Sequence, residues 1–256
     1  MALADEIARV MVRSTSDIRP AAEALRGIAW ERARLRVSPA DNIASKQPLC
    51  DEDGAILASE VFGWNAPHER WWADSRLALS SPLPRACRYE SETFWANAQG
   101  FYTRQPNRYL DAIDLSNFEK RALCKAAIVV PIHLPFGQIG AVSFTSSDPE
   151  RTDLSAEFEA HSDELALLAH RFIAGCVKAH RTRQWLPVDC QLTKREVECL
   201  RWASVGKTDK EISLILGRSH ATVRFHIQNA GEKLDAVNRS QTIFKASQLG
   251  YLGTAA

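Results

Sequence analysis

The chain has 256 residues, of which 45% are hydrophobic and 25% are charged, and its formal net charge is +1. These values are ordinary for globular proteins, so the composition excludes a disordered or fibrous chain, and the length predicts two domains. No apolar run approaches the roughly 18 residues that cross a bilayer. The opening segment MALADEIARVMVRS lacks the basic and apolar regions of a signal peptide, so we expect a cytoplasmic protein.

The N-terminal part of the chain mixes helical and strand patterns. Apolar spacing predicts helices over 3–14 and 19–27, and alternation over 32–37 predicts a half-buried strand. The run AAIVVPIHLPFGQIGAVSFTSS (126–147) predicts two apolar strands joined by a tight turn at PFG, long enough to lie in the centre of a sheet. A long helix is expected over 155–182. This order favours an α+β fold, with an N-terminal α-β-α sandwich whose helices cover a mainly antiparallel sheet.

The proline-containing segment TRQWLPVDC interrupts the periodicity of that long helix and predicts a linker. We therefore expect a sensor-like domain over 1–180, a linker over 181–190 and an all-α domain over 191–256. From residue 191 onward, ten basic side chains oppose six acidic ones, which gives +4 there and leaves −3 for the rest of the chain. A small basic domain behind an acidic one suits contact with phosphate groups through one end only.

Three helix starts in the last domain have the capping-box pattern, in which a cap residue and a Glu or Gln three positions later satisfy free backbone N–H groups. These are Thr193 to Glu196, Thr208 to Glu211 and Asn238 to Gln241. Ser219 can cap a further helix, and Gly206 and Gly217 stand where helices must end. Four helices are thus expected, over roughly 194–205, 209–216, 220–234 and 239–249.

The second and third of these helices are separated only by Gly217, Arg218 and Ser219. A short glycine-containing turn between two helices is the geometry of a helix-turn-helix, in which the later helix enters the major groove of DNA. The sequence therefore predicts a four-helix DNA-binding domain.

The third helix has a buried stripe and an outer face. The stripe consists of apolar residues at helical spacing: Val223, Ile227, Ala230 and Leu234. With about 100° per residue, Arg224 lies roughly 100° from the first of these, Gln228 roughly 140° and Ala221 roughly 160°. Arginine pairs with guanine O6 and N7, and glutamine pairs with adenine N6 and N7. We therefore expect Arg224 and Gln228 to read bases.

The segment LTKREVECLRWASVGKTDKEISLILGRSHATVRFHIQNAGEKLDAVNRSQTIFKASQLGYL (192–252) resembles the LuxR-type helix-turn-helix over some 60 residues. The likeness includes the LTxRExECLxW opening and the GKT turn. In the third helix it includes Thr222-Val223, His226 and Asn229. The resemblance implies base reading by Arg224 and Gln228. It assigns contacts with the DNA backbone to Lys207, Thr222 and the neighbouring His220.

The same resemblance implies a homodimer that binds an inverted repeat, with half-sites about one helical turn apart. In such a dimer the last helix packs against its counterpart. The residues assigned to that contact are Ile243, Ala246 and Leu249.

Residues 1–180 resemble, more loosely, the autoinducer-binding domain of quorum-sensing LuxR regulators. The likeness includes the tryptophan-rich stretch, the central hairpin and the long helix before the linker. The lactone pockets of that family use an Asp-Pro pair whose carboxylate accepts the lactone amide N–H, and here the pair reads Ser81-Pro82. A serine hydroxyl still accepts a hydrogen bond but lacks the negative charge.

Other pocket positions of the family are changed as well. The tyrosine nine residues before the Asp-Pro pair is Trp72, which donates only through its indole N–H. The tryptophan four residues earlier is His68, or Trp64 if the alignment slips, and the glycine at the start of the central strand is Ala127. Of the family's pocket positions, Pro82 and Trp95 match.

Two interpretations of this half remain open. In one, the pocket binds a small molecule other than a standard acyl-homoserine lactone, with Ser81 as polar anchor among aromatic side chains. The aromatic candidates are Trp64, Trp71, Trp72, Phe94 and Trp95. In the other, these aromatics fill the core, and the protein folds and binds DNA without a ligand. The ligand contacts that we predict are Trp64, Trp72, Ser81 and Trp95.

Other functional classes are less well supported. A phosphoacceptor receiver and a GxxxxGK[ST] nucleotide loop are missing from the sequence. Cys87 and Cys124 have no local signature that links them to a histidine base, so we expect no enzyme, no metal site and no cofactor. An anti-activator that traps other regulators in inactive heterodimers is a stronger rival, but it would not need Arg224 or Gln228.

Overall fold

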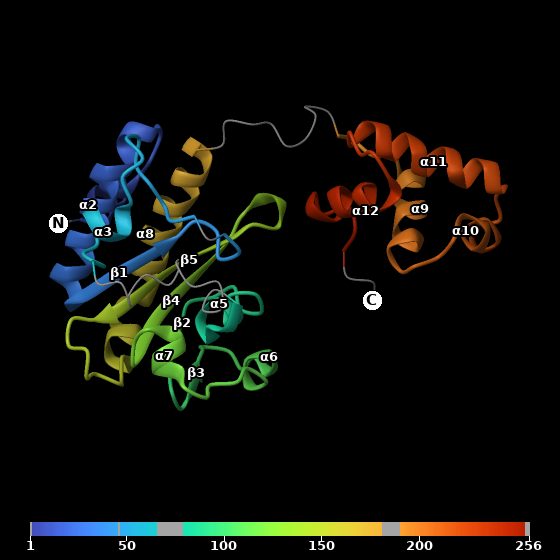
Figure 1. Cartoon of the computed structure of the whole chain (residues 1–256). Coiled ribbons are helices and arrows are strands. Elements are labelled where there is room, and N and C mark those ends of the chain that lie inside the picture. The colour runs from blue at the N-terminus through green and yellow to red at the C-terminus, as the bar shows by residue number, and fades with distance from the viewer. Residues whose placement is uncertain (1, 46, 66–78, 181–189, 254–256) are drawn as a thin grey trace. The chain divides into compact units, whose positions relative to one another are not determined.

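The computed structural model describes residues 2–45, 47–65, 79–180 and 190–253, and the chain divides into two compact units (Figure 1). The N-terminal unit contains an antiparallel sheet with helices, and the C-terminal unit contains helices α9 to α12, so the predicted α+β class is confirmed. No helix in the described ranges is long and apolar enough to cross a membrane.

The structure gives the following bounds in the N-terminal unit: α1 Leu3–Val10, α2 Ile18–Ala33, β1 Leu35–Ala40, α3 Leu57–Glu60, α5 Pro82–Ala86, β2 Phe94–Asn97, β3 Gly100–Tyr102, α6 Arg108–Asp111, α7 Phe118–Ala122, β4 Ala126–His133, β5 Ile139–Ser146 and α8 Ser155–His180. In the C-terminal unit they are α9 Lys194–Ser204, α10 Asp209–Leu216, α11 His220–Lys233 and α12 Arg239–Gln248.

The sheet has five strands in the order β1-β5-β4-β2-β3, and each neighbouring pair is antiparallel. The predicted central hairpin is confirmed, because β4 pairs with β5 from Ile128 opposite Phe144 to His133 opposite Ile139. Its turn needs the left-handed backbone region, which Phe136 and Gly137 occupy with φ of 68° and 72°. The hairpin therefore places β4 in the middle of the sheet.

Strand β4 is buried on both faces. Ile128, Val130 and Ile132 belong to one hydrophobic cluster, whereas Ala127 and Val129 belong to a second. Successive side chains of a strand point to opposite faces, so the two clusters lie on opposite sides of the sheet. This explains why the sequence of β4 is continuously apolar rather than alternating.

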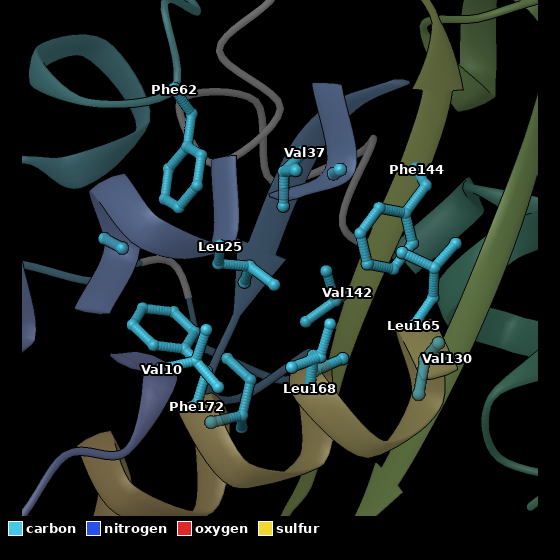
Figure 2. Close-up of a cluster of buried hydrophobic side chains, with 14 of the residues drawn as sticks. Val10, Leu25, Val37, Phe62, Val130, Val142, Phe144, Leu165, Leu168 and Phe172 are labelled. Atoms are coloured by element: carbon cyan, nitrogen blue, oxygen red, sulfur yellow. The ribbon is translucent and has the colours of Figure 1, made fainter. Parts of the chain in front are cut away.

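Helices α1, α2 and α8 cover one face of the sheet and form the larger cluster (Figure 1). Figure 2 shows Val10 of α1, Leu25 of α2 and Phe172 of α8 in the same buried cluster as Val142 and Phe144 of β5. Each such side chain stabilises the fold by roughly 1.5–3 kcal/mol when fully buried. These three helices are therefore the structural support of the unit.

Helix α2 extends further than the sequence pattern predicts. It runs to Ala33, so the strand expected over 32–37 begins only at Leu35. Arg34 ends the helix in the left-handed region with φ of 53°, and its N–H bonds the carbonyls of Ala29 and Trp30. Arg32 is part of the helix rather than of the strand.

The four helices of the C-terminal unit begin and end within one residue of the predicted bounds. Thr193 and Thr208 each accept a hydrogen bond from the N–H of the glutamate three residues later, and both capping boxes are complete. Ser219 caps α11 by accepting from Thr222 N–H. Asn238 caps α12, but Gln241 Oε1 accepts from Val237 N–H rather than from Asn238.

Candidate functional site

The face of the sheet opposite α2 and α8 carries small and hydroxyl side chains, which leave a cavity of about 80 Å³. These side chains alternate along three strands with the large residues of the other face. The strand residues that line the cavity are Ser38, Ala40, Val129, Ala141, Ser143 and Thr145. The cavity therefore exists because this face holds small residues where the other holds Phe144 and Val142.

Helix α5 forms an opposing wall of the cavity and positions Ser81. Pro82 occupies the first turn of α5, where its missing N–H costs nothing, and Ser81 is the N-cap. The Ser81 side chain makes no cap hydrogen bond, and the residue is 8% exposed and lines the cavity. Ser81 is thus part of the cavity wall, and its hydroxyl does not cap the helix.

Trp64 lines the same cavity and is held rigidly by strand β1. Its Nε1 donates a hydrogen bond of 2.6 Å to the carbonyl oxygen of Val37. The guanidinium of Arg36 lies 3.7 Å from the centre of its ring, within the range of a cation–π contact. Trp64 is only 8% exposed and belongs to the larger hydrophobic cluster, so it contributes to both core and cavity.

The other aromatic candidates are placed differently. Trp95 belongs to the cluster on the helix-covered face, and its ring stacks on that of Tyr102 with centroids 4.0 Å apart. It is not among the side chains described as lining the cavity. Phe94 is buried in the second cluster. The structure thus brings Trp64 and Ser81 to one cavity and leaves Trp95 outside it, while Trp72, with Trp71 and His68, lies outside the described residues.

Arg121 of α7 is a cavity residue that sequence reasoning missed. Its Nε and Nη2 donate to the carbonyl of Ser80 at 2.8 and 2.5 Å, and its Nη1 reaches Asp114 Oδ2 at 2.8 Å. Nη1 also donates to the carbonyls of Asp114 and Ser116. Arg121 therefore joins the segment just before α5 to the loop before α7, which fixes the backbone beside Ser81. No local sequence pattern predicts this role, because the partners of Arg121 include a backbone carbonyl 41 residues away in the sequence.

Most side chains that line the cavity are apolar, and apart from Arg121 and two thiols its described polar side chains are hydroxyls. Within the described part of the chain, no aspartate or glutamate lines it. Cys87 lines it too, and burial raises the pKa of that thiol to about 12, so the thiol stays protonated at neutral pH. No group of three potential metal ligands is found among the residues that the structure describes.

The C-terminal unit has the predicted helix-turn-helix. Gly217 ends α10 in the left-handed region with φ of 61°, and α11 begins three residues later at His220. The predicted stripe packs into the core of the unit, together with residues of α9, α10 and α12. Its members are at most 6% exposed: Val223, Ile227, Ala230 and Leu234.

Arg224 and Gln228 are exposed on the face of α11 away from this core, as is Ala221. His220 is exposed at the N-terminus of α11, where helix N–H groups and the macrodipole favour anions such as phosphate. The Thr222 hydroxyl pairs with that of Ser219 at 2.8 Å. His220 and Thr222 thus lie in the first turn of α11, and Arg224 and Gln228 lie on its exposed side.

Lys207 lies near the start of α10 and is partly engaged within the unit. Its Nζ is 3.6 Å from Glu211 Oε1, and its carbonyl accepts from Arg239 Nη2 at 2.7 Å. A surface ion pair of this length adds little stability, so the Lys207 side chain keeps most of its conformational freedom. Its ammonium group can therefore turn to a phosphate.

Three of the ten basic residues of this unit serve the fold. Lys233 bonds the buried Glu196 at 2.9 Å, and Arg239 pairs with Asp209. Lys245 is 5% exposed and donates to the carbonyls of Leu234 and Asp235 at 2.9 and 2.7 Å, which satisfies the end of α11. The positive charge available to DNA is therefore carried by the remaining basic residues, Arg224 among them.

The predicted dimer residues of helix α12 differ in their exposure to solvent. Ala246 is fully buried in the core of its own unit, so the dimer contact predicted for it does not fit this placement. Ile243 and Leu249 pack against the same core but are only partly buried. The large apolar side chain that α12 exposes is Phe244, at 53%.

Comparisons with known proteins agree with both halves of this architecture. Residues 190–246 match the model of the bacterial regulatory proteins of the luxR family, and residues 58–174 match the autoinducer binding domain. The chain is 40% identical over 157 residues to the transcriptional activator protein VanR of Vibrio anguillarum, a match that covers 57% of this chain and 63% of VanR.

A longer match is to the quorum sensing-dependent transcriptional regulator VjbR of Brucella abortus, with 37% identity over 200 residues, 70% of this chain and 75% of VjbR. A crystal structure of Escherichia coli SdiA aligns with 24% identity and a TM-score of 0.40, over 72% of each chain. The chain therefore belongs to the LuxR family of DNA-binding transcriptional regulators.

Proposed function

We propose that this protein is a sequence-specific regulator of the quorum-sensing type that binds an inverted-repeat element as a dimer and responds to a small molecule other than a standard acyl-homoserine lactone. The observation that carries the proposal is the exposure of Arg224 and Gln228 on α11, opposite its buried stripe. In this proposal residues 1–180 sense the signal, 181–190 link the domains and 191–256 bind DNA.

The proposed DNA contacts follow from the chemistry of each side chain. Arg224 donates two hydrogen bonds to a guanine, and Gln228 exchanges two with an adenine. His220, Thr222 and Lys207 contact the phosphate backbone, which positions the helix without reading sequence. In the dimer, α12 helices face each other through exposed and half-buried residues, and half-sites lie about one helical turn apart.

The proposed ligand site is the cavity between α5 and the sheet, with Ser81 and Trp64 as contacts. A lactone amide N–H would meet a neutral hydroxyl there rather than a carboxylate, and neutral hydrogen bonds are roughly half as strong as charge-assisted ones. The other hydroxyls of the cavity belong to Ser38, Ser143 and Thr145. They favour a ligand with its own donors and acceptors. Trp72 remains a predicted contact.

A second candidate is a regulator that needs no ligand. Trp64 favours this candidate, because its indole N–H already bonds the carbonyl of Val37 and its ring packs in the larger hydrophobic cluster. Neither interaction needs a ligand. An anti-activator is disfavoured, because its function would leave Arg224 and Gln228 without a purpose.

The proposal is tested by selecting duplexes from a random DNA library with the purified full chain. We expect an inverted repeat of roughly 18–20 base pairs. Arg224→Ala should weaken binding by about 1–3 kcal/mol and relax the preference at one base pair in each half-site. Arg201→Ala removes another exposed arginine, from α9, and should leave the base preference intact. A uniform loss for Arg224→Ala across all sequences would show a phosphate contact instead and would contradict the proposal.

A further inference from the structure

Phe225 is a large apolar side chain on the exposed face of α11, with 57% of its surface accessible. Single exposed apolar residues are common, so exposure alone implies nothing. The position of Phe225 on the helix is more informative. With about 100° per residue, Phe225 lies roughly 200° from Val223, almost directly opposite the buried stripe. It therefore occupies the outermost line of α11.

A second apolar residue shares this line. Ala221 precedes Phe225 by four residues, lies roughly 160° from Val223 and is also exposed. The ring of Phe225 meets that of His226 edge to face, with centroids 5.8 Å apart. An apolar strip thus runs along α11 beside the polar line of Arg224 and Gln228.

The chemistry of the major groove limits what such a strip can contact. The base edges there carry hydrogen-bond donors and acceptors, and the C5-methyl group of thymine is their apolar feature. A phenyl ring against a donor or acceptor would remove its water without supplying a hydrogen bond, which is unfavourable. A phenyl ring against a methyl group gains from burial of apolar surface.

We propose that Phe225 is a specificity-determining residue that packs against the C5-methyl group of a thymine in each half-site, next to the bases contacted by Arg224 and Gln228. This inference rests on the proposed function, since it requires α11 to lie in the major groove. The inference adds an apolar contact with thymine to the hydrogen bonds proposed for base recognition.

The test replaces each thymine of the selected element by deoxyuridine, which removes only the methyl group. Binding of the full chain is then measured by fluorescence anisotropy. Burial of one methyl group corresponds to about fourfold in affinity. We expect a loss of that order at one thymine in each half-site for the native protein. At that position Phe225→Ala should bind thymine and uracil duplexes equally, and more weakly than the native protein binds thymine.

Leu214→Ala is the matched control, because it removes a 77%-exposed apolar side chain from α10 and should keep the preference for thymine. Phe225→Leu retains an apolar side chain and should keep part of the preference, which covers the case of an alanine variant that does not fold. The inference is overturned if no thymine shows a methyl effect, or if Phe225→Ala retains it. A library that yields no common element would instead overturn the proposed function, and this inference with it.

Discussion

Several side chains that shape this protein act by donating hydrogen bonds to distant backbone carbonyls. Trp64 bonds Val37, Arg121 bonds Ser80, and Lys245 bonds Leu234 and Asp235. Short motifs in the sequence predict the helix caps, since cap and partner lie three residues apart. They do not predict these contacts, because a carbonyl has no sequence signature and its partner is set by tertiary packing.

Glu196 shows how one buried charge joins two helices. Burial raises its pKa, but hydrogen bonds from Thr193 N–H and Lys233 Nζ outweigh burial, so the pKa is lowered from its usual value of 4.5. Because the folded pKa lies below the unfolded one, ionised Glu196 stabilises the unit above about pH 4.5. This contribution is lost as the pH falls through the folded pKa.

Glu196→Gln should therefore lower the free energy of unfolding by about 1–2 kcal/mol at pH 7, because a neutral acceptor replaces a buried carboxylate. The measurement is urea unfolding of native and variant protein at pH 7 and near pH 3.5, where the difference should shrink. Glu198→Gln is the control. It breaks a more exposed pair with Arg195, and we expect a change below about 0.5 kcal/mol. Equal losses for both variants would contradict this account of Glu196.

At the scale of elements, the C-terminal helices were predictable almost residue by residue, because a cap residue marks the start of each and a glycine follows the end of α9, α10 and α12. The N-terminal unit was predictable in class and in its central hairpin. The face on which a strand side chain lies was not, since it depends on register. Trp95 is the example: it adjoins Phe94, yet the two enter opposite clusters. A shift of one residue decides which of them faces the cavity side.

Gly217 sets the turn between α10 and α11. A Cβ there would meet no atom within 4 Å, so the cost of a substitution comes from its left-handed backbone alone. Gly217→Ala should destabilise the protein by about 1–2 kcal/mol in urea unfolding. Gly217→Asn should cost less, because asparagine tolerates this conformation. An equal or larger loss for asparagine would point to a steric cause and contradict the backbone argument.

Helix α12 offers different predictions for a core residue and a surface residue. Phe244→Glu places a charge on the exposed face and should weaken self-association in sedimentation equilibrium while leaving unfolding unchanged. Ala246→Leu overfills the core and should lower the free energy of unfolding by about 1–3 kcal/mol. If Ala246→Leu instead dissociated a dimer without loss of stability, Ala246 would lie in the interface after all.

At the scale of the whole molecule, one unit has a cavity whose described lining includes no carboxylate, and the other has the polar face of α11 that we propose reads DNA. The first leads to a prediction about ligands. Long-chain acyl-homoserine lactones should leave the melting temperature unchanged. A bound ligand at 100 times its Kd would add about 2.7 kcal/mol, which corresponds to a shift of roughly 5–11 °C at this chain length. A lactone-dependent shift of that size in differential scanning fluorimetry would show that Ser81 suffices in place of aspartate.

The central claim is that α11 reads DNA sequence, and the most direct test is a ratio of two affinities. The full chain is titrated at 150 mM salt, on the order of physiological ionic strength, against the selected inverted repeat and against a scrambled duplex of the same composition. Phosphate contacts contribute to both affinities, so the ratio isolates base reading. The account predicts that the inverted repeat binds at least about 10³-fold more tightly. Equal affinity for the two duplexes would contradict it.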